Sequence, residues 1–79
     1  MLIRSQDKTK IINIKNVSVI NFFGMNGVLA ISVKALDVSY SIAEYSTKEK
    51  ALKVLDMIQE AYVNGHIDYQ IPADSEVVV

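Results

Sequence analysis

The sequence predicts an α+β fold: a four- or five-stranded antiparallel sheet, connected as a meander, with one C-terminal helix (about residues 46–64) packed on one face. Two patterns predict it, a capped amphipathic helical segment and an Asn-Gly pair between two β-branched runs. The composition agrees, because 51% apolar and 22% charged residues in a chain of 79 are typical of one folded domain.

The start of the chain predicts a first hairpin. Residues 2–5 and 10–14 flank the polar segment Gln6-Asp7-Lys8-Thr9, which has the composition of a turn. Lys15-Asn16 then leads the chain into the next strand. In total we expect four or five strands.

The central hairpin has the clearest turn signal. Asn26-Gly27 separates residues 17–23 from residues 28–35, and this dipeptide favours the tight turns that join antiparallel strands. The predicted loop contains either two or four residues. Both lengths keep the same faces of the two strands together, because they differ by an even shift in register. With the two-residue loop, the predicted partners are Phe22 with Ile31 and Ile20 with Val33.

Residues 38–45 alternate in polarity and predict the next strand of the meander. A tight connection at Leu36-Asp37 sets its register, although a loop one or two residues longer is the alternative, because these residues suit a primed turn poorly. With the tight connection, the predicted partners are Tyr40 with Val33 and Ile42 with Ile31. We expect the helix to cover the resulting core face, which consists of Ile20, Phe22, Leu29, Ile31, Val33, Tyr40 and Ile42.

The helix is predicted to begin at Ser46-Thr47-Lys48-Glu49. In this S-x-x-E capping box, the side chains of Ser46 and Glu49 each accept from the other residue's free amide. Asn64-Gly65 ends the helix, because glycine readily adopts the left-handed conformation found there. The apolar face, at spacings of 3 and 4, consists of Ala51, Leu52, Leu55, Ile58, Ala61 and Tyr62.

The opposite face of the sheet carries more apolar surface than a solvated face, because Val17, Val19 and Phe23 are all predicted to point to it. Its cover is the first hairpin, the C-terminal tail or a second copy of the chain. The tail, residues 67–79, alternates before its proline and is interpreted as a short edge strand or an oligomer contact outside a domain of residues 1–66. The candidate interface residues are Val17, Val19, Phe23, Tyr62, Tyr69 and Ile71.

No pattern of catalytic, cofactor-binding or metal-ligating residues stands out in the sequence. The chain has no cysteine and one histidine, His66, which follows the helix-ending glycine as an ordinary surface residue would. Asp56 and Glu60 share a helix face, but two carboxylates without further oxygen ligands bind a cation weakly. We therefore expect no enzyme, no cofactor and no small-molecule substrate.

The charges are unevenly distributed around a net charge of −1. Residues 1–34 carry five basic and one acidic side chain, whereas residues 35–79 carry three basic and eight acidic ones. The low net charge argues against strong nucleic-acid binding. The alternative function is nevertheless a nucleic-acid-associated accessory protein that uses its basic N-terminal hairpin, through Arg4, Lys8, Lys10 and Lys15.

Part of the chain resembles a known group of proteins. Residues 44–59 (EYSTKEKALKVLDMIQ), together with the opening Leu2-Ile3-Arg4-Ser5-Gln6-Asp7, are similar to small uncharacterised proteins of Gram-positive bacteria and their phages. The resemblance implies a β-rich fold with one C-terminal helix, similar to a reduced pleckstrin-homology-like sheet and helix. It implies no catalytic residues.

The leading hypothesis for function is a non-enzymatic protein-interaction module that self-associates as a homo-oligomer or binds another protein. A domain this small has little stability to spare, because apolar burial and conformational entropy nearly cancel, and a partner adds burial. We expect a cytoplasmic location and no membrane partner. The N-terminus lacks the apolar core of a signal peptide, and no apolar run approaches the roughly 20 residues that cross a bilayer.

Overall fold

The computed structural model describes residues 1–25 and 27–79, with the side chains of Met25 and Val28 left outside that description. Within these residues the chain forms one α-helix and six strands, which make two three-stranded sheets. The α+β class with one helix is confirmed, whereas the strands divide between two sheets where one was expected. The elements are β1 (Leu2–Arg4), β2 (Ile11–Asn13), β3 (Val17–Met25), β4 (Val28–Ala35), β5 (Val38–Tyr45), α1 (Lys48–Val63) and β6 (Asp68–Gln70), with short 3-10 turns η1 (Ile14–Asn16) and η2 (Asp74–Glu76).

One sheet is the predicted antiparallel meander, in the order β3-β4-β5. The register of its first hairpin is confirmed, and the strands stay paired as far as the predicted Asn26-Gly27 turn. Asn26 itself lies outside the described residues. The pairs that establish this register are Phe22 with Ile31, Ile20 with Val33 and Met25 with Val28.

The β4–β5 connection is the tight two-residue turn at Leu36-Asp37. Both residues have positive φ angles, 50° and 65°, which is the backbone of a primed turn. The longer loop is therefore wrong, although leucine adopts this left-handed conformation only at a cost. Tyr40 lies opposite Val33, as predicted.

A bulge in β5 changes the next predicted pair. The register shifts between Ile31 and Ser32, so that Ala43 lies opposite Ile31 and the expected Ile42–Ile31 pair is wrong. The extra residue interrupts the alternation of the strand, and Ile42 and Ala43 are consequently both buried.

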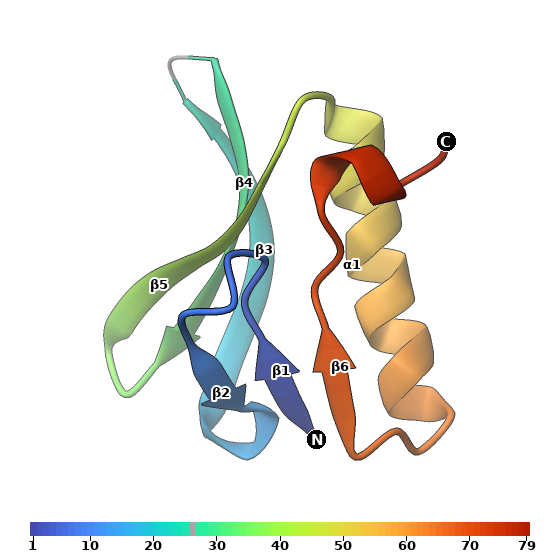
Figure 1. Cartoon of the computed structure of the whole chain (residues 1–79). Coiled ribbons are helices and arrows are strands. Elements are labelled where there is room, and N and C mark those ends of the chain that lie inside the picture. The colour runs from blue at the N-terminus through green and yellow to red at the C-terminus, as the bar shows by residue number, and fades with distance from the viewer. Residues whose placement is uncertain (26) are drawn as a thin grey trace.

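The other sheet has the order β2-β1-β6. Strand β1 runs antiparallel to β2, which forms the predicted first hairpin, and parallel to β6 from the C-terminal tail. Ile3, at the centre of β1, is fully buried between its partners Ile12 and Tyr69. In the view of Figure 1 this small sheet stands in front of the meander, with α1 to its right.

Gln6 joins the two sheets. Its backbone N–H donates to the carbonyl of Ile42 (2.8 Å). Its side-chain amide donates to the Glu44 carbonyl (3.0 Å) and accepts from the Glu44 N–H (3.0 Å). The same amide nitrogen also reaches the Pro72 carbonyl at 3.3 Å. Gln6 thus occupies the outer edge of β5 as a residue of a paired strand would.

The helix begins one residue later than predicted. The Thr47 hydroxyl oxygen, not that of Ser46, caps α1 by accepting from the Lys50 N–H at 3.2 Å. Ser46 is occupied elsewhere, because both its backbone N–H (2.8 Å) and its hydroxyl (3.0 Å) donate to the carboxylate of Asp74. The predicted Ser46–Glu49 capping box is therefore wrong.

The buried face of α1 is also rotated from the predicted one. Val54, which was not assigned to the face, is fully buried, whereas Leu52 is 41% and Tyr62 is 61% exposed. The helix ends as predicted at Gly65, whose φ is 76°. The helix residues that are buried are Ala51, Val54, Ile58 and Ala61. They pack in one core with Ile3, Ile31, Val33, Ile42, Ala43, Tyr45, Ile71 and Val77.

The C-terminal tail is part of this packing. Ile71 and Val77 lie in the core, and the Tyr45 hydroxyl donates to the Pro72 carbonyl at 2.7 Å. The tail then returns to the beginning of α1 (Figure 1), where Asp74 forms an ion pair with Lys50 at 3.4 Å. Residues 67–79 thus contribute both a strand and core side chains.

Candidate interaction site

The outer edge of β3 is open over most of its length. β3 is an end strand of its sheet, and between Ser18 and Gly24 no hydrogen bond among the described residues reaches its backbone from outside that sheet. About half of the N–H and C=O groups of an edge strand point away from its neighbour. β3 therefore presents a row of unpaired backbone groups to solvent.

Apart from the bulge between Val17 and Val19 at its start, β3 lacks the features that usually protect such an edge. Proteins blunt open edges with charged residues, prolines or very short strands. Val17–Met25 is nine residues long and contains no charged residue and no proline. The end strands of the small sheet, β2 and β6, have only three residues each, and Gln6 covers part of the β5 edge.

An apolar groove of about 350 Å³ opens between β3 and α1. A second hollow adjoins it, because Ile14 and Tyr62 line both. The groove lies beside the open edge, since Ile20 of β3 forms part of its wall. The lining residues are Ile14, Ile20, Leu55, Ile58, Gln59 and Tyr62 in the groove, with Met1 and Lys15 in the adjoining hollow.

The predicted interface residues of β3 fall on two faces. Val19, which is 47% exposed, and Phe23, which is 36% exposed, lie on the outer face of the sheet. Val17 packs against the core, so its expected position on the second face is wrong. The cause is a bulge between Val17 and Val19, which turns Val17 to the other side of the strand.

The other candidate interface residues differ in accessibility. Tyr62 is exposed and lines the groove. Tyr69 is half-buried against the core, and this burial, helped by the nearby Glu60 carboxylate, raises the pKa of its hydroxyl. Ile71 is 1% exposed and belongs to the core, so it is not available to a partner.

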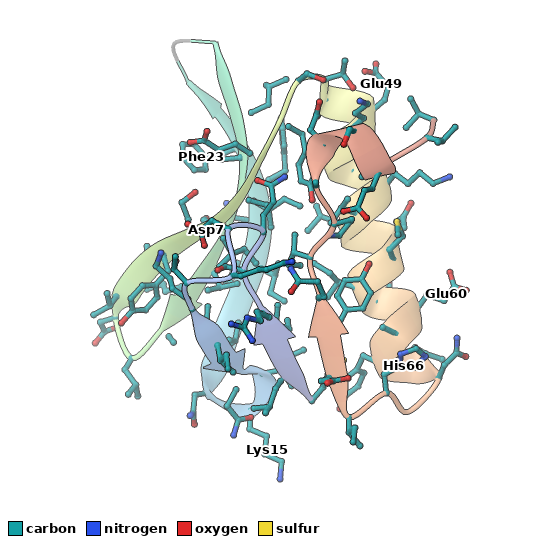
Figure 2. All side chains as sticks on the ribbon, in the orientation of Figure 1. Asp7, Lys15, Phe23, Glu49, Glu60 and His66 are labelled. Carbon is teal, nitrogen blue, oxygen red and sulfur yellow. The ribbon has the colours of Figure 1, made fainter. Side chains whose placement is uncertain are left out.

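Three of the four candidate basic residues, Arg4, Lys8 and Lys10, lie on the first hairpin, and Lys15 lies beyond it in η1. The Arg4 guanidinium donates to the Lys8 carbonyl at 3.0 Å and lines a hollow on the small sheet. Lys10 lines a different hollow, and Lys15 lines the one beside the α1–β3 groove. Figure 2 shows Phe23 and Lys15 at opposite ends of the molecule. Lys15 and the Phe23 ring are thus not neighbours, and nucleic-acid contact through Arg4, Lys8 and Lys10 stays a prediction.

The loop of the first hairpin is organised by Asp7, which Figure 2 labels. Its Oδ1 accepts from the Thr9 hydroxyl (2.6 Å), the Ser5 hydroxyl (2.7 Å) and the Thr9 N–H (3.0 Å). These hydrogen bonds, the one from the Thr9 side chain foremost, hold the pKa of the carboxyl well below its usual range. Asp7 therefore acts as the ionised anchor of a turn.

The remaining polar candidates stay apart. His66 is exposed beyond the end of α1 (Figure 2), and Asp56 and Glu60 are exposed on the helix. Over residues 1–25 and 27–79, no three His, Cys, Asp or Glu side chains come together as a metal site. Within the same part of the chain, no helix has the length and apolarity needed to span a membrane.

Sequence reasoning missed the groove and the open edge. The groove combines Ile14 and Ile20 with residues of a distant helix, so only the tertiary fold brings its walls together. The edge did leave a signal, namely the absence of charge and proline over residues 17–25.

No family model, curated protein or solved structure matches the chain. The similarity to proteins of Gram-positive bacteria and their phages stays a prediction.

Proposed function

We propose that this chain is a non-enzymatic protein-interaction module that self-associates through the outer edge of β3. The observation that carries the proposal is the open nine-residue edge, uncharged and free of proline, beside the apolar α1–β3 groove. An extended segment added to β3 would satisfy its outward backbone groups. Alternate side chains of that segment would reach the groove.

The exposed apolar side chains around the edge support the same function. Val19 and Phe23 flank it on the outer face, and Tyr62 stands at the groove on the other side. A strand that pairs with β3 passes between these two surfaces and shields parts of both from water. Burial of this kind adds stability at about 25 cal/mol per Å² of apolar surface, which a small domain needs.

Sedimentation velocity from micromolar to millimolar concentration tests the proposal. We expect a concentration-dependent oligomer that Val19→Lys weakens by about tenfold or more in dissociation constant, because a lysine on an edge strand opposes pairing. Ile67→Lys is the matched control, since Ile67 is 84% exposed and lies outside β3. A wild-type chain that stays monomeric over the whole range contradicts the proposal.

A further inference from the structure

We infer that the segment that pairs with β3 is β3 of a second copy, in an antiparallel pair whose two-fold axis passes through Asn21. This inference rests on the proposed function and adds the identity and register of the partner strand. Two meanders would then join edge to edge into one continuous six-stranded sheet.

Asn21 lies at the centre of β3. Asn21 is the midpoint of Val17–Met25, so a two-fold axis at this residue sets the full length of one β3 beside the other, with regular pairing over residues 19–23 and the bulge of each copy at an end of the pair. Any other register leaves residues unpaired at both ends of the shared strand. The longest ladder satisfies the most outward backbone groups.

The side chains on either side of Asn21 also suit a two-fold pair. On the outer face, Val19 of one copy would lie opposite Phe23 of the other, and both are exposed apolar residues in the single chain. Aromatic and β-branched residues form favourable cross-strand pairs. No charged residue is brought against another anywhere along the pair, because β3 contains none.

The core face of β3, beside the groove, would gain contacts in the same pair. Phe22 of the second copy would lie opposite Ile20, a residue of the groove wall. Phe22 packs partly against its own core, and the remaining exposed part of its ring would lie against the apolar groove of about 350 Å³ of the other copy. The two-fold axis gives each copy the same contact, so the pair contains two such contacts.

Asn21 itself suits a position on the axis. Its side chain lies on the outer face, where Oδ1 accepts from the Ser32 hydroxyl at 3.1 Å. This leaves the amide nitrogen to donate to Asn21 of the second copy. An exposed asparagine at the centre also permits substitution without disturbing the core.

Cysteine cross-linking tests the register, because the natural chain contains no cysteine. Residues directly opposite each other in an antiparallel pair have Cα atoms about 4.5 to 5.5 Å apart, within reach of a disulfide. Asn21→Cys should therefore cross-link with itself under mild oxidation. We expect its yield to exceed that of the exposed control Ile67→Cys by about tenfold, owing to the high effective concentration across the axis.

A mixed pair of variants provides the second readout. Val19→Cys should cross-link with Phe23→Cys when one chain carries a size tag, and neither should cross-link with itself. In the proposed register, two copies of residue 19 lie about 14 Å apart along the strands, too far for a disulfide. Circular dichroism confirms that each variant is folded.

The outcomes separate this inference from the proposed function. A dimer by sedimentation whose cross-links peak at other positions, or show no preference, overturns the Asn21 register and leaves self-association standing. A chain that is monomeric at all concentrations overturns both.

Discussion

The link that Gln6 forms between the two sheets leads to a sharp prediction for the variants Gln6→Ala and Gln6→Glu. Three side-chain hydrogen bonds depend on this residue, two at 3.0 Å with Glu44 and one at 3.3 Å with Pro72. Hydrogen bonds of this kind contribute about 0.5 to 1.5 kcal/mol each, and the partly exposed setting favours the lower values. We expect Gln6→Ala to lower the free energy of unfolding by about 2 kcal/mol.

Gln6→Glu keeps the shape of the side chain and replaces the hydrogen-bond-donating amide nitrogen with a carboxylate oxygen that only accepts. The carboxylate still accepts from the Glu44 N–H but loses both donors and faces the carbonyl oxygens of Glu44 and Pro72. These oxygens disfavour the charged form, so the pKa of the new carboxyl is raised in the folded state relative to about 4.3 in the unfolded chain. The deficit relative to the wild type is then largest at neutral pH, shrinks as the pH falls through the raised folded-state pKa, and changes no further below about pH 4.3, where the carboxyl is protonated in both states.

Urea denaturation measures the free energy of unfolding of both variants and of the wild type. All samples are compared at the same protein concentration, because self-association changes the apparent stability. In thermal unfolding, 2 kcal/mol corresponds to a drop of about 8 to 16 °C for a domain of this size. A Gln6→Ala variant within about 0.5 kcal/mol of the wild type would refute the role assigned to Gln6 in joining the sheets.

Three further predictions concern the helix, the β4–β5 turn and the tail. Val54→Ala should cost about 2 kcal/mol and Leu52→Ala less than about 1 in urea denaturation, since only Val54 is fully buried; equal losses would contradict the helix face observed here. Combining Leu36→Asn with Asp37→Gly should raise the unfolding free energy by about 1 kcal/mol, because both positions have positive φ; a loss of stability would contradict the primed turn. Asp74→Asn should lower the urea midpoint at pH 7 and converge with the wild type in acid. The hydrogen bond from the Ser46 backbone N–H, helped by the Ser46 hydroxyl and Lys50, lowers the folded-state pKa of Asp74. The stabilisation by the Asp74 carboxylate is therefore present above about pH 4 and is lost as the pH falls through the folded-state pKa. An equal deficit at neutral and acid pH would contradict this linkage.

The parts of the fold that local patterns determine were predictable from the sequence. The Asn-Gly pair and the β-branched runs gave the register of the central hairpin, including the opposition of Phe22 and Ile31. Helix periodicity and the terminal Gly65 located α1 and its end. Each of these features depends on residues close together in the chain.

The errors arose where distant segments compete for the same groups. Ser46 has an ideal capping sequence, but the tail brings Asp74 to it, and Thr47 then caps the helix instead. The bulge at Ile42 places that residue's carbonyl against Gln6, which lies far away in the sequence. The parallel β1–β6 pair joins the two ends of the chain, and no local pattern specifies such a pairing.

The candidate interaction site was likewise predictable only where it depends on residues close together in the chain. The open edge could be predicted in part, because an uncharged, proline-free strand beside a turn is recognisable in the sequence. Its position at the end of the sheet and the groove beside it depend on which strands pair and where α1 packs. The alternation of residues along β3 predicted the wrong face for Val17, because one bulge moves this side chain to the other face of the strand.

The most direct test of the account is an isotope-filtered NOE experiment on a mixture of labelled and unlabelled chains, in which only contacts between copies are observed. The proposed β3–β3 pair predicts intermolecular contacts between Val19 of one copy and Phe23 of the other, and between the backbones of the two Asn21 residues. A sample at millimolar concentration that shows no intermolecular contact along β3 would contradict it.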